Sequence, residues 1–369
     1  MPEPLPFTRI VRGLPSFIPF VGPETMEREK GRPFELRIGA NESAFGISPR
    51  ARDAMCGAVD KVSWYNDPEN HDLREALGQI HGVSPEEICV SAGIDDLLGL
   101  VVRALVEPGD PVVSCRGSYP TFAFHVQGFA GRQEQVPYLD DCSDLNGLAS
   151  KVRETGAHLV YVANPDNPMG TWHTAPALAA FVSQLPEDCV AIVDEAYVEF
   201  APAQAVWATN SVDHPRLIRT RTFSKVHGMA GARIGYAIAH RDMVAGLEKV
   251  RNHFGVNRVA QAGALASLLD TAFVEGVVTQ VEAGRRDYVE LAAGLGLSSV
   301  SSGTNFLCID LGSGGRARAV QQALLEKDVF VRMPSVSPQD RCIRVTVGTE
   351  AERSRFAELF TEIVEAVHP

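Results

Sequence analysis

The chain has 369 residues, of which 45% are hydrophobic and 22% are charged, as in an ordinary globular protein that is too long for one simple core. Its net charge of −12 and its pI near 5.3 argue against a nucleic acid or an anionic membrane as a partner. Any anion that it binds must therefore be attracted by a local cluster of cations and helix N-termini.

The cysteine pattern indicates neither a metal centre nor a disulfide framework. The seven cysteines are scattered, with no CxxC pair and no histidine spacing typical of zinc. The segment MPEPLPFTRI has no apolar signal core, and no run approaches roughly 18 uncharged apolar residues. We therefore expect a cytoplasmic protein with reduced thiols and no metal.

The N-terminal region is predicted to be mostly irregular. Pro15, Pro19 and Pro23 interrupt any helix in this region, and a short helix is expected after Pro23. FELRIGANES then predicts a strand that enters a turn. Residues 48–82 predict two helices, which are separated by the loop SWYNDPEN.

A regular alternation of strands and helices begins near Glu87. The predicted strands are EICVSAG, GDPVVSC, RQEQVPY, AHLVYVANP, DCVAIVDEAY, LIRTRTFS and ARIGYAIA. Short apolar strands that alternate with amphipathic helices indicate an α/β fold, and we predict a large domain with a mostly parallel seven-stranded sheet flanked by helices.

The pattern changes after Asp242. A long helical stretch at 256–294, with one break near 270–272, is followed by three strands (TNFLCIDL, VFVRM and CIRVTVG) and two helices. This pattern predicts a smaller α+β domain. We expect residues 1–47 to form an N-terminal arm and part of the small domain, 48–265 the large domain, and 266–369 the small C-terminal domain.

The most informative stretch is RTFSKVHGMAGARIGY at 221–236. Ser224 precedes Lys225, and Arg233 follows after a loop of small residues that permits close backbone approach. Lysine, serine and arginine on one loop can hold a phosphate monoester beside a reactive amine. The alternative is an exposed basic loop.

Two loops at the carboxyl ends of predicted strands carry candidate ligand-binding residues, and such edges are where α/β sheets bind ligands. In SAGIDD, the backbone N–H groups beside Gly93, Ile94 and Asp95 could take a phosphate, although an acidic helix cap is an alternative. In ANPDNPMGTW, Asn167 can donate its amide into a site, although a plain turn is an alternative.

A third strand, VAIVDEAYVEF, ends on Asp194 and is followed by Tyr197. A Walker B element would need a GxxxxGK[ST] loop, which the chain lacks. A cap or salt-bridge acid is an alternative, but beside Lys225 a carboxylate that faces a cationic ring nitrogen makes better sense.

The loop DLGSGGRARA fits a relaxed dinucleotide pattern through Gly312, Gly314 and Ala317. The next acid, Asp328, comes about eleven residues later rather than about twenty. A strand-to-helix turn explains the loop better, and an NAD-dependent dehydrogenase stays an alternative.

Taken together, these motifs resemble a known family. Asn167-Pro168-x-Gly170, Asp194-x-x-Tyr197 and Ser224-Lys225 with Arg233, in that order, resemble the fold-type I pyridoxal-phosphate (PLP) enzymes. The chain is most similar to the histidinol-phosphate aminotransferase branch of the class I/II aminotransferases, and the likeness covers nearly its whole length.

The resemblance implies a role for each candidate. Lys225 would bind PLP through a Schiff base and move protons, and Asp194 would pair with the ring nitrogen. Asn167 and Tyr197 would bind the ring oxygen, and Tyr119 would cover the ring face. The phosphate would be held by Ser224, Arg233 and the N–H groups at Gly93, Ile94 and Asp95, with Tyr65 coming from the neighbouring subunit of a homodimer.

The resemblance also places substrate contacts at Arg344, Arg332, Phe20 and Asn41. Histidinol phosphate with 2-oxoglutarate is the first expectation. Phe20 replaces a usual tyrosine, and the lost hydrogen bond of roughly 1.5–3 kcal/mol would weaken phosphate binding about 10- to 150-fold. An aromatic or broad-specificity aminotransferase is therefore the close alternative, ahead of a phospho-amino-acid decarboxylase and a catalytically silent binding protein.

Overall fold

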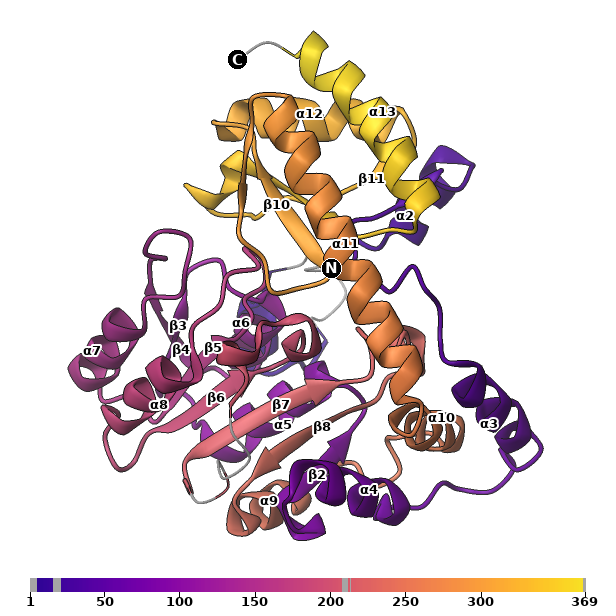
Figure 1. Ribbon diagram of the computed structural model, residues 1–369. Coiled ribbons are helices and arrows are strands. Elements are labelled where there is room, and N and C mark those ends of the chain that lie inside the picture. The colour runs from indigo at the N-terminus through magenta and orange to yellow at the C-terminus, as the bar shows by residue number, and fades with distance from the viewer. Residues whose placement is uncertain (1–4, 16–20, 208–211, 213, 368–369) are drawn as a thin grey trace.

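The computed structural model describes residues 5–15, 21–207, 212 and 214–367, so the prediction for Phe20 lies outside it. Within these residues a seven-stranded sheet has the order β2-β8-β7-β6-β5-β3-β4 (Figure 1). Strand β8 runs antiparallel to both of its neighbours, β2 and β7, and the other adjacent strands of this sheet are parallel to each other. The predicted α/β fold is confirmed. The strands are β2 (Ile88–Ser91), β3 (Pro111–Cys115), β4 (Arg132–Val136), β5 (Leu159–Ala163), β6 (Val190–Asp194), β7 (Leu217–Thr222) and β8 (Gly235–Ala239).

The central strands are apolar because helices cover both faces of the sheet. Every residue of β5 and β6 is buried. One face packs against α5 (Ile94–Leu105), α6 (Pro120–Gly128) and α9 (Arg241–Glu248). The other face packs against α7 (Leu145–Thr155) and α8 (Ala175–Ser183).

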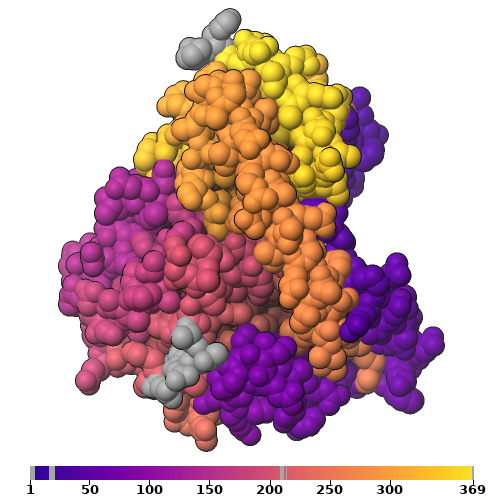
Figure 2. Space-filling view, in the orientation of Figure 1, coloured from indigo at the N-terminus to yellow at the C-terminus, as the bar shows by residue number. Residues whose placement is uncertain are grey.

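A second, smaller body is built around the antiparallel sheet β12-β10-β9 within the described ranges. It appears as the orange and yellow lobe at the top of Figure 2. Its helices share one apolar cluster with β10 and β12. Its elements are α11 (Thr271–Gly294), β9 (Ser298–Val300), β10 (Phe306–Asp310), α12 (Gly314–Glu326), β11 (Val329–Phe330), β12 (Cys342–Thr346) and α13 (Glu350–Ala366).

The N-terminal region joins this smaller body. Strand β1 (Leu36–Arg37) pairs in parallel with β11, and Leu36 and Ile38 lie in the same apolar cluster. Helix α2 (Pro23–Lys30) forms where the sequence predicts a helix. The exact domain boundaries at residues 47 and 265 stay predictions.

Three expectations differ from the observed elements. Helix α1 (Arg9–Gly13) lies in a region expected to be irregular, because Thr8 accepts a hydrogen bond from the Val11 N–H as an N-cap. The strand expected over FELRIGANES is limited to β1, since the chain turns at Asn41, where φ is 57°. Helix α9 and strand β9 were not expected.

The long helical stretch breaks where predicted, between α10 (Arg258–Leu268) and α11. In the described ranges no single helix is long and apolar enough to cross a membrane; α10 and α11 meet that test only as a pair, and they are bent by 81°. Helix α10 packs against α3 (Pro49–Val59), which lies at the margin of the molecule (Figure 1). The Gly312 loop is the turn into α12, with Ser313 as its N-cap.

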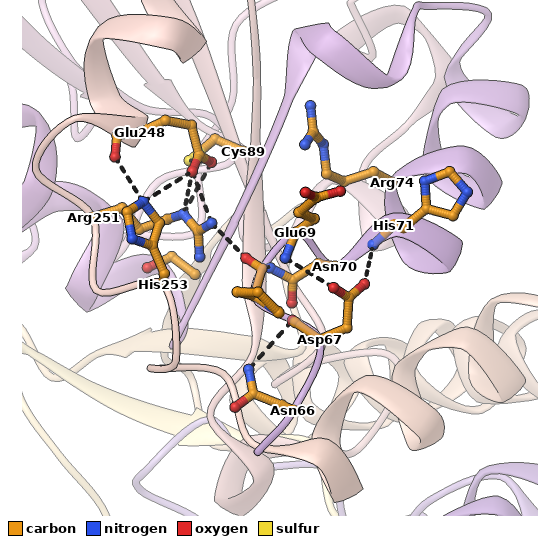
Figure 3. A network of polar contacts seen from close by, with 12 residues as sticks. Asn66, Asp67, Glu69, Asn70, His71, Arg74, Cys89, Glu248, Arg251 and His253 are labelled. Carbon is orange, nitrogen blue, oxygen red and sulfur yellow. Dashed lines mark hydrogen bonds and ion pairs between the residues drawn. The ribbon is translucent and has the colours of Figure 1, made fainter. Parts of the chain in front are cut away.

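A polar network fixes the loop between α3 and α4 (His71–His81) (Figure 3). Asp67 accepts hydrogen bonds from the backbone N–H groups of Glu69 and His71, at 3.0 and 2.7 Å. Arg251 is held by Glu248 and donates to the Pro68 carbonyl at 2.8 Å. The segment that follows Tyr65 is therefore anchored to the large body.

The loop after Lys225 is packed against the N-terminal segment at Gly228. Its φ is 69°, a backbone conformation that L-amino acids rarely adopt and that glycine adopts without strain. A Cβ atom at Gly228 would lie 1.8 Å from the Gly46 carbonyl oxygen. Any side chain at this position would push these two segments apart.

Replacing Gly228 with alanine should lower the free energy of unfolding by at least about 2 kcal/mol, because strain and a backbone clash add. Urea denaturation measures the effect. Gly231→Ala is the matched control, since its Cβ would meet nothing within 4 Å and its φ is not positive. Equal stability of the two variants would contradict the described contact.

Candidate active site

A cavity of about 550 Å³ opens at the carboxyl edge of the large sheet, between that sheet and the smaller body. Residues from both bodies and from the N-terminal segment line it. The predicted site residues that line it are Asn41, Ile94, Asp95, Tyr119, Asn167, Asp194, Tyr197, Ser224, Lys225, Arg233, Arg332 and Arg344. Three segments that are distant in the sequence thus converge on one space.

Asp194 and Lys225 reach this cavity from neighbouring parallel strands. Asp194 ends β6 and pairs with Thr220 of β7, and Lys225 follows the end of β7 by three residues. Because both strands point their carboxyl ends to the same edge, the acid and the amine open onto the same cavity.

The Asp194 carboxyl is almost completely buried, with 4% of its surface exposed. It accepts hydrogen bonds from the Tyr161 hydroxyl at 2.8 Å and from the Ala196 N–H at 3.1 Å. Burial raises the pKa of Asp194 to about 6, although these hydrogen bonds act against the shift. A cation beside this carboxyl would stabilise its ionised form.

Tyr161 is a site residue that the sequence analysis missed. It lies in the middle of β5, is fully buried, and lines the cavity. A signal did exist, because a tyrosine hydroxyl inside an otherwise apolar buried strand needs a hydrogen-bond partner. The partner is the carboxylate of Asp194.

Lys225 is positioned by the N-terminal segment. Its Nζ atom donates to the Asn41 carbonyl at 3.0 Å and lies 5.3 Å from the centre of the Tyr197 ring. The Asn41 amide in turn donates to the Tyr197 hydroxyl oxygen at 2.9 Å. The Tyr197 O–H is thus left to donate to a ligand in the cavity.

One end of the cavity is suited to an anion. The Arg233 guanidinium contacts the Ser224 hydroxyl and the Asp95 carboxylate, both at 3.4 Å. Gly93 is the N-cap of α5, where no described side chain caps the helix, and the first helical residues, Ile94 and Asp95, line the cavity. Backbone N–H groups at such an uncapped helix start can bind an anion. Gly93 itself does not line the cavity.

The conformation of Gly93 nevertheless matters for this end. Its φ is 93°, and a Cβ atom would lie 2.6 Å from an Arg233 nitrogen. A glycine therefore allows the guanidinium to approach the start of α5. Asp95 also accepts a hydrogen bond from the Tyr119 hydroxyl at 2.7 Å, which fixes the Tyr119 ring in the cavity wall.

The opposite end of the cavity holds two arginines from the smaller body. The backbones of Arg332 and Arg344 form an antiparallel bridge, and both residues line the cavity. Arg344 donates to the Asn167 amide oxygen at 2.5 Å, which leaves the Asn167 NH₂ group as a donor. The Nε atom of Arg344 is buried without a hydrogen-bond partner among the described residues.

Burial lowers the pKa of both arginines, and the charge of Arg344 lowers that of Arg332 further. A guanidinium never loses its proton in practice, so the shift measures an unfavourable environment for two neighbouring cations. A bound anion would relieve this repulsion. The arrangement predicts an anionic ligand group at this end as well.

Among the candidates that the structure describes, Gly93 and Tyr65 do not line the cavity of this chain. Tyr65 is 80% exposed and packs against Phe254, with ring centres 5.0 Å apart. Phe20 lies outside the described residues.

His227, two residues after Lys225, is buried and contacts Ser267 at 2.8 Å. Burial lowers the pKa of His227 to about 4, so this side chain is a neutral packing residue.

Known proteins share this architecture. Residues 35–360 match the family "Aminotransferase class I and II". A histidinol-phosphate aminotransferase of Carboxydothermus hydrogenoformans is 33% identical over 97% of this chain and 99% of its own length.

Solved structures show the same similarity. The histidinol-phosphate aminotransferase of Sinorhizobium meliloti, solved in complex with pyridoxal-5'-phosphate, is 43% identical, with a TM-score of 0.96 over 99% of both chains. The aspartate aminotransferase of Thermus thermophilus, 21% identical with a TM-score of 0.83 over 97% of this chain and 99% of its own, shares the fold. The expected family is confirmed: this chain is an enzyme that belongs to the class I and II aminotransferases.

Proposed function

We propose that this enzyme uses pyridoxal 5'-phosphate to transfer an amino group from L-histidinol phosphate to 2-oxoglutarate. The observation that carries the proposal is the arrangement of one cavity, with an amine and a buried acid at its centre and a cationic site at each end. The similarity to two histidinol-phosphate aminotransferases, one of them solved with this cofactor, supports it.

The residues of the cavity fit pyridoxal phosphate. Arg233, Ser224 and the N–H groups at the start of α5 would hold its phosphate. Asp194 would accept a hydrogen bond from the protonated ring nitrogen, and a cation there suits a buried carboxylate. Asn167 and Tyr197 each keep a donor for the ring oxygen, and Tyr119 would cover one face of the ring.

The cofactor supplies an electron-withdrawing ring that stabilises negative charge at the substrate Cα atom. Asp194 would maintain that property by keeping the ring nitrogen charged. The Lys225 amine would lie beside the ring, take the proton from the substrate Cα atom and deliver it to the C4′ carbon of the cofactor. Asn41 holds this amine in place through its backbone carbonyl.

The two arginines explain the choice of substrates. Histidinol phosphate carries a dianionic phosphate, and 2-oxoglutarate carries two carboxylates. Arg332 and Arg344 together can bind either dianion, whereas a substrate with one carboxylate needs a single bidentate arginine. The unpartnered Nε atom of Arg344 is a further donor for such an anion.

An aromatic amino-acid aminotransferase is the second candidate. It is favoured by Phe20, which offers no hydroxyl to a phosphate, and by the apolar Met333 and Pro334 in the cavity wall. Such a substrate would place its carboxylate on Arg344 and leave Arg332 without an anion.

We further propose a homodimer in which Tyr65 reaches the cofactor phosphate of the partner subunit. Tyr65 does not line the cavity of its own chain and is exposed, as are Val59, Val62, Trp64 and Phe254, the last of which packs against its ring. Burial of these side chains against a second copy would stabilise the pair. The seven free cysteines support a cytoplasmic location.

The role of Lys225 predicts a specific covalent label. Borohydride treatment of the cofactor-loaded enzyme should attach the cofactor to Lys225, as peptide mass spectrometry would show. Lys225→Ala should lose the label and about 10²- to 10⁴-fold in turnover. The exposed Lys61→Ala is the control. A label on another lysine would refute the assignment.

Substrate choice is tested by single half-reactions followed through the cofactor absorbance. Histidinol phosphate should react with a higher kcat/KM than phenylalanine or tyrosine. Arg332→Met should raise KM for histidinol phosphate about 10- to 150-fold, because a hydrogen-bonded charge pair is lost. Arg286→Met, on the exposed side of α11, should leave KM unchanged. Preference for phenylalanine would favour the second candidate.

Active sites shared between two subunits predict that the variants Lys225→Ala and Tyr65→Ala complement each other. A heterodimer of Lys225→Ala and Tyr65→Ala chains contains one site in which both residues are intact. Co-refolding the two should give more activity than either homodimer, measured at limiting cofactor. Activity no higher than the average of the homodimers would show that Tyr65 does not cross between subunits.

A further inference from the structure

The wall of the cavity on the side of the smaller body is one short segment, Arg332–Arg341. Arg332, Met333, Pro334 and Ser335 line the cavity. Gly117 of the large body lies close to this segment: a Cβ atom added at Gly117 would be 3.2 Å from the Val336 side chain. The position of this segment therefore sets where the Arg332 guanidinium meets a ligand.

An ion pair fastens the far end of this segment to the large body. Arg341 donates to both oxygens of the Asp141 carboxylate, through Nη2 at 2.6 Å and Nη1 at 3.2 Å. The side chains are 24% and 17% exposed, so solvent screens the pair only in part. Arg341 is also held within its own body by Asp310 at 2.7 Å.

Two further contacts join this segment to the large body. The Gln339 amide donates to the same Asp141 carboxylate at 3.3 Å, and Arg116 of the large body donates to the Ser337 carbonyl at 3.4 Å. The segment is thus joined to the large body at several points, and Asp141 takes part in most of them.

Asp141 also contacts a second loop that lines the cavity. Its carbonyl oxygen accepts a hydrogen bond from the Thr171 hydroxyl at 2.9 Å, in the loop that carries Asn167. Asp140 and Asp141 both have positive φ angles, 48° and 62°, so the chain turns sharply where Asp141 makes these contacts. One residue outside the cavity therefore spans the two loops that hold Asn167 and Arg332.

We propose that Asp141 is a positioning residue for the substrate anion: its ion pair with Arg341 holds the segment Arg332–Ser335 over the cavity so that Arg332 faces that anion. The substrate part of this inference rests on the proposed function. The positional part rests only on the contacts above, and the two are tested by different measurements.

Asp141→Asn is the sharpest variant, because asparagine keeps the shape of the side chain and tolerates a positive φ. It removes the charge and leaves Arg341 paired with Asp310. Asp287→Asn is the matched control, since it removes an ion pair to Arg353 of similar length, 2.7 Å, on helices that do not line the cavity. Arg341→Lys, which keeps the charge but loses the two-pronged contact, is the second variant.

The first measurement is the kinetics of the half-reaction with histidinol phosphate. Asp141→Asn should raise KM about 10-fold, with kcat within about 2-fold of wild type, since the lost contact acts on binding. Arg341→Lys should shift KM in the same direction, and Asp287→Asn should not. Unchanged KM in Asp141→Asn, or an equal shift in Asp287→Asn, would overturn the proposed role.

The second measurement needs no turnover. Amide hydrogen exchange over residues 332–341 should become faster in Asp141→Asn and stay at the wild-type rate in Asp287→Asn. If wild-type enzyme does not react with histidinol phosphate, the proposed function fails, and this exchange result still decides the positional role. Wild-type exchange rates in Asp141→Asn would overturn it.

Discussion

The active site depends on the parallel pairing of strand β6 with strand β7. This pairing puts Asp194 and the Lys225 loop at one edge of the sheet, so that a buried carboxyl and an amine share a cavity. Burial alone would favour the protonated acid, as the raised pKa of Asp194 shows. The site is therefore preorganised for a ligand that brings a positive charge to that carboxyl.

The rest of the chain completes this centre from outside the sheet. The N-terminal segment contributes Asn41, whose carbonyl holds Lys225 and whose amide holds Tyr197. The smaller body contributes the two arginines, and Asp141 ties their segment back to the large body. A cationic group at each end and an acid in the middle define where an extended, charged ligand can lie.

The sequence predicted most of this arrangement because its signals are local. The apolar strands give the sheet, and the rule that ligands bind at carboxyl ends of strands brings Asn167, Asp194 and Lys225 together. The assignment of roles to Tyr119 and Arg344 came from the family resemblance. Tyr161 was missed because its importance depends on its hydrogen bond to the acid at the end of the neighbouring strand β6. Asp141 was missed because its partner is 200 residues away and comes close only in the folded chain.

The central claim is that one cofactor ring touches both the Lys225 amine and the Asp194 carboxyl. The most direct measurement is a crystal structure of the enzyme loaded with pyridoxal phosphate. We expect the ring nitrogen within about 2.6–3.2 Å of an Asp194 oxygen, with continuous density between the cofactor and Lys225 Nζ and the phosphate against Arg233. A cofactor bound outside this cavity, or a ring nitrogen with no contact to Asp194, would contradict the account.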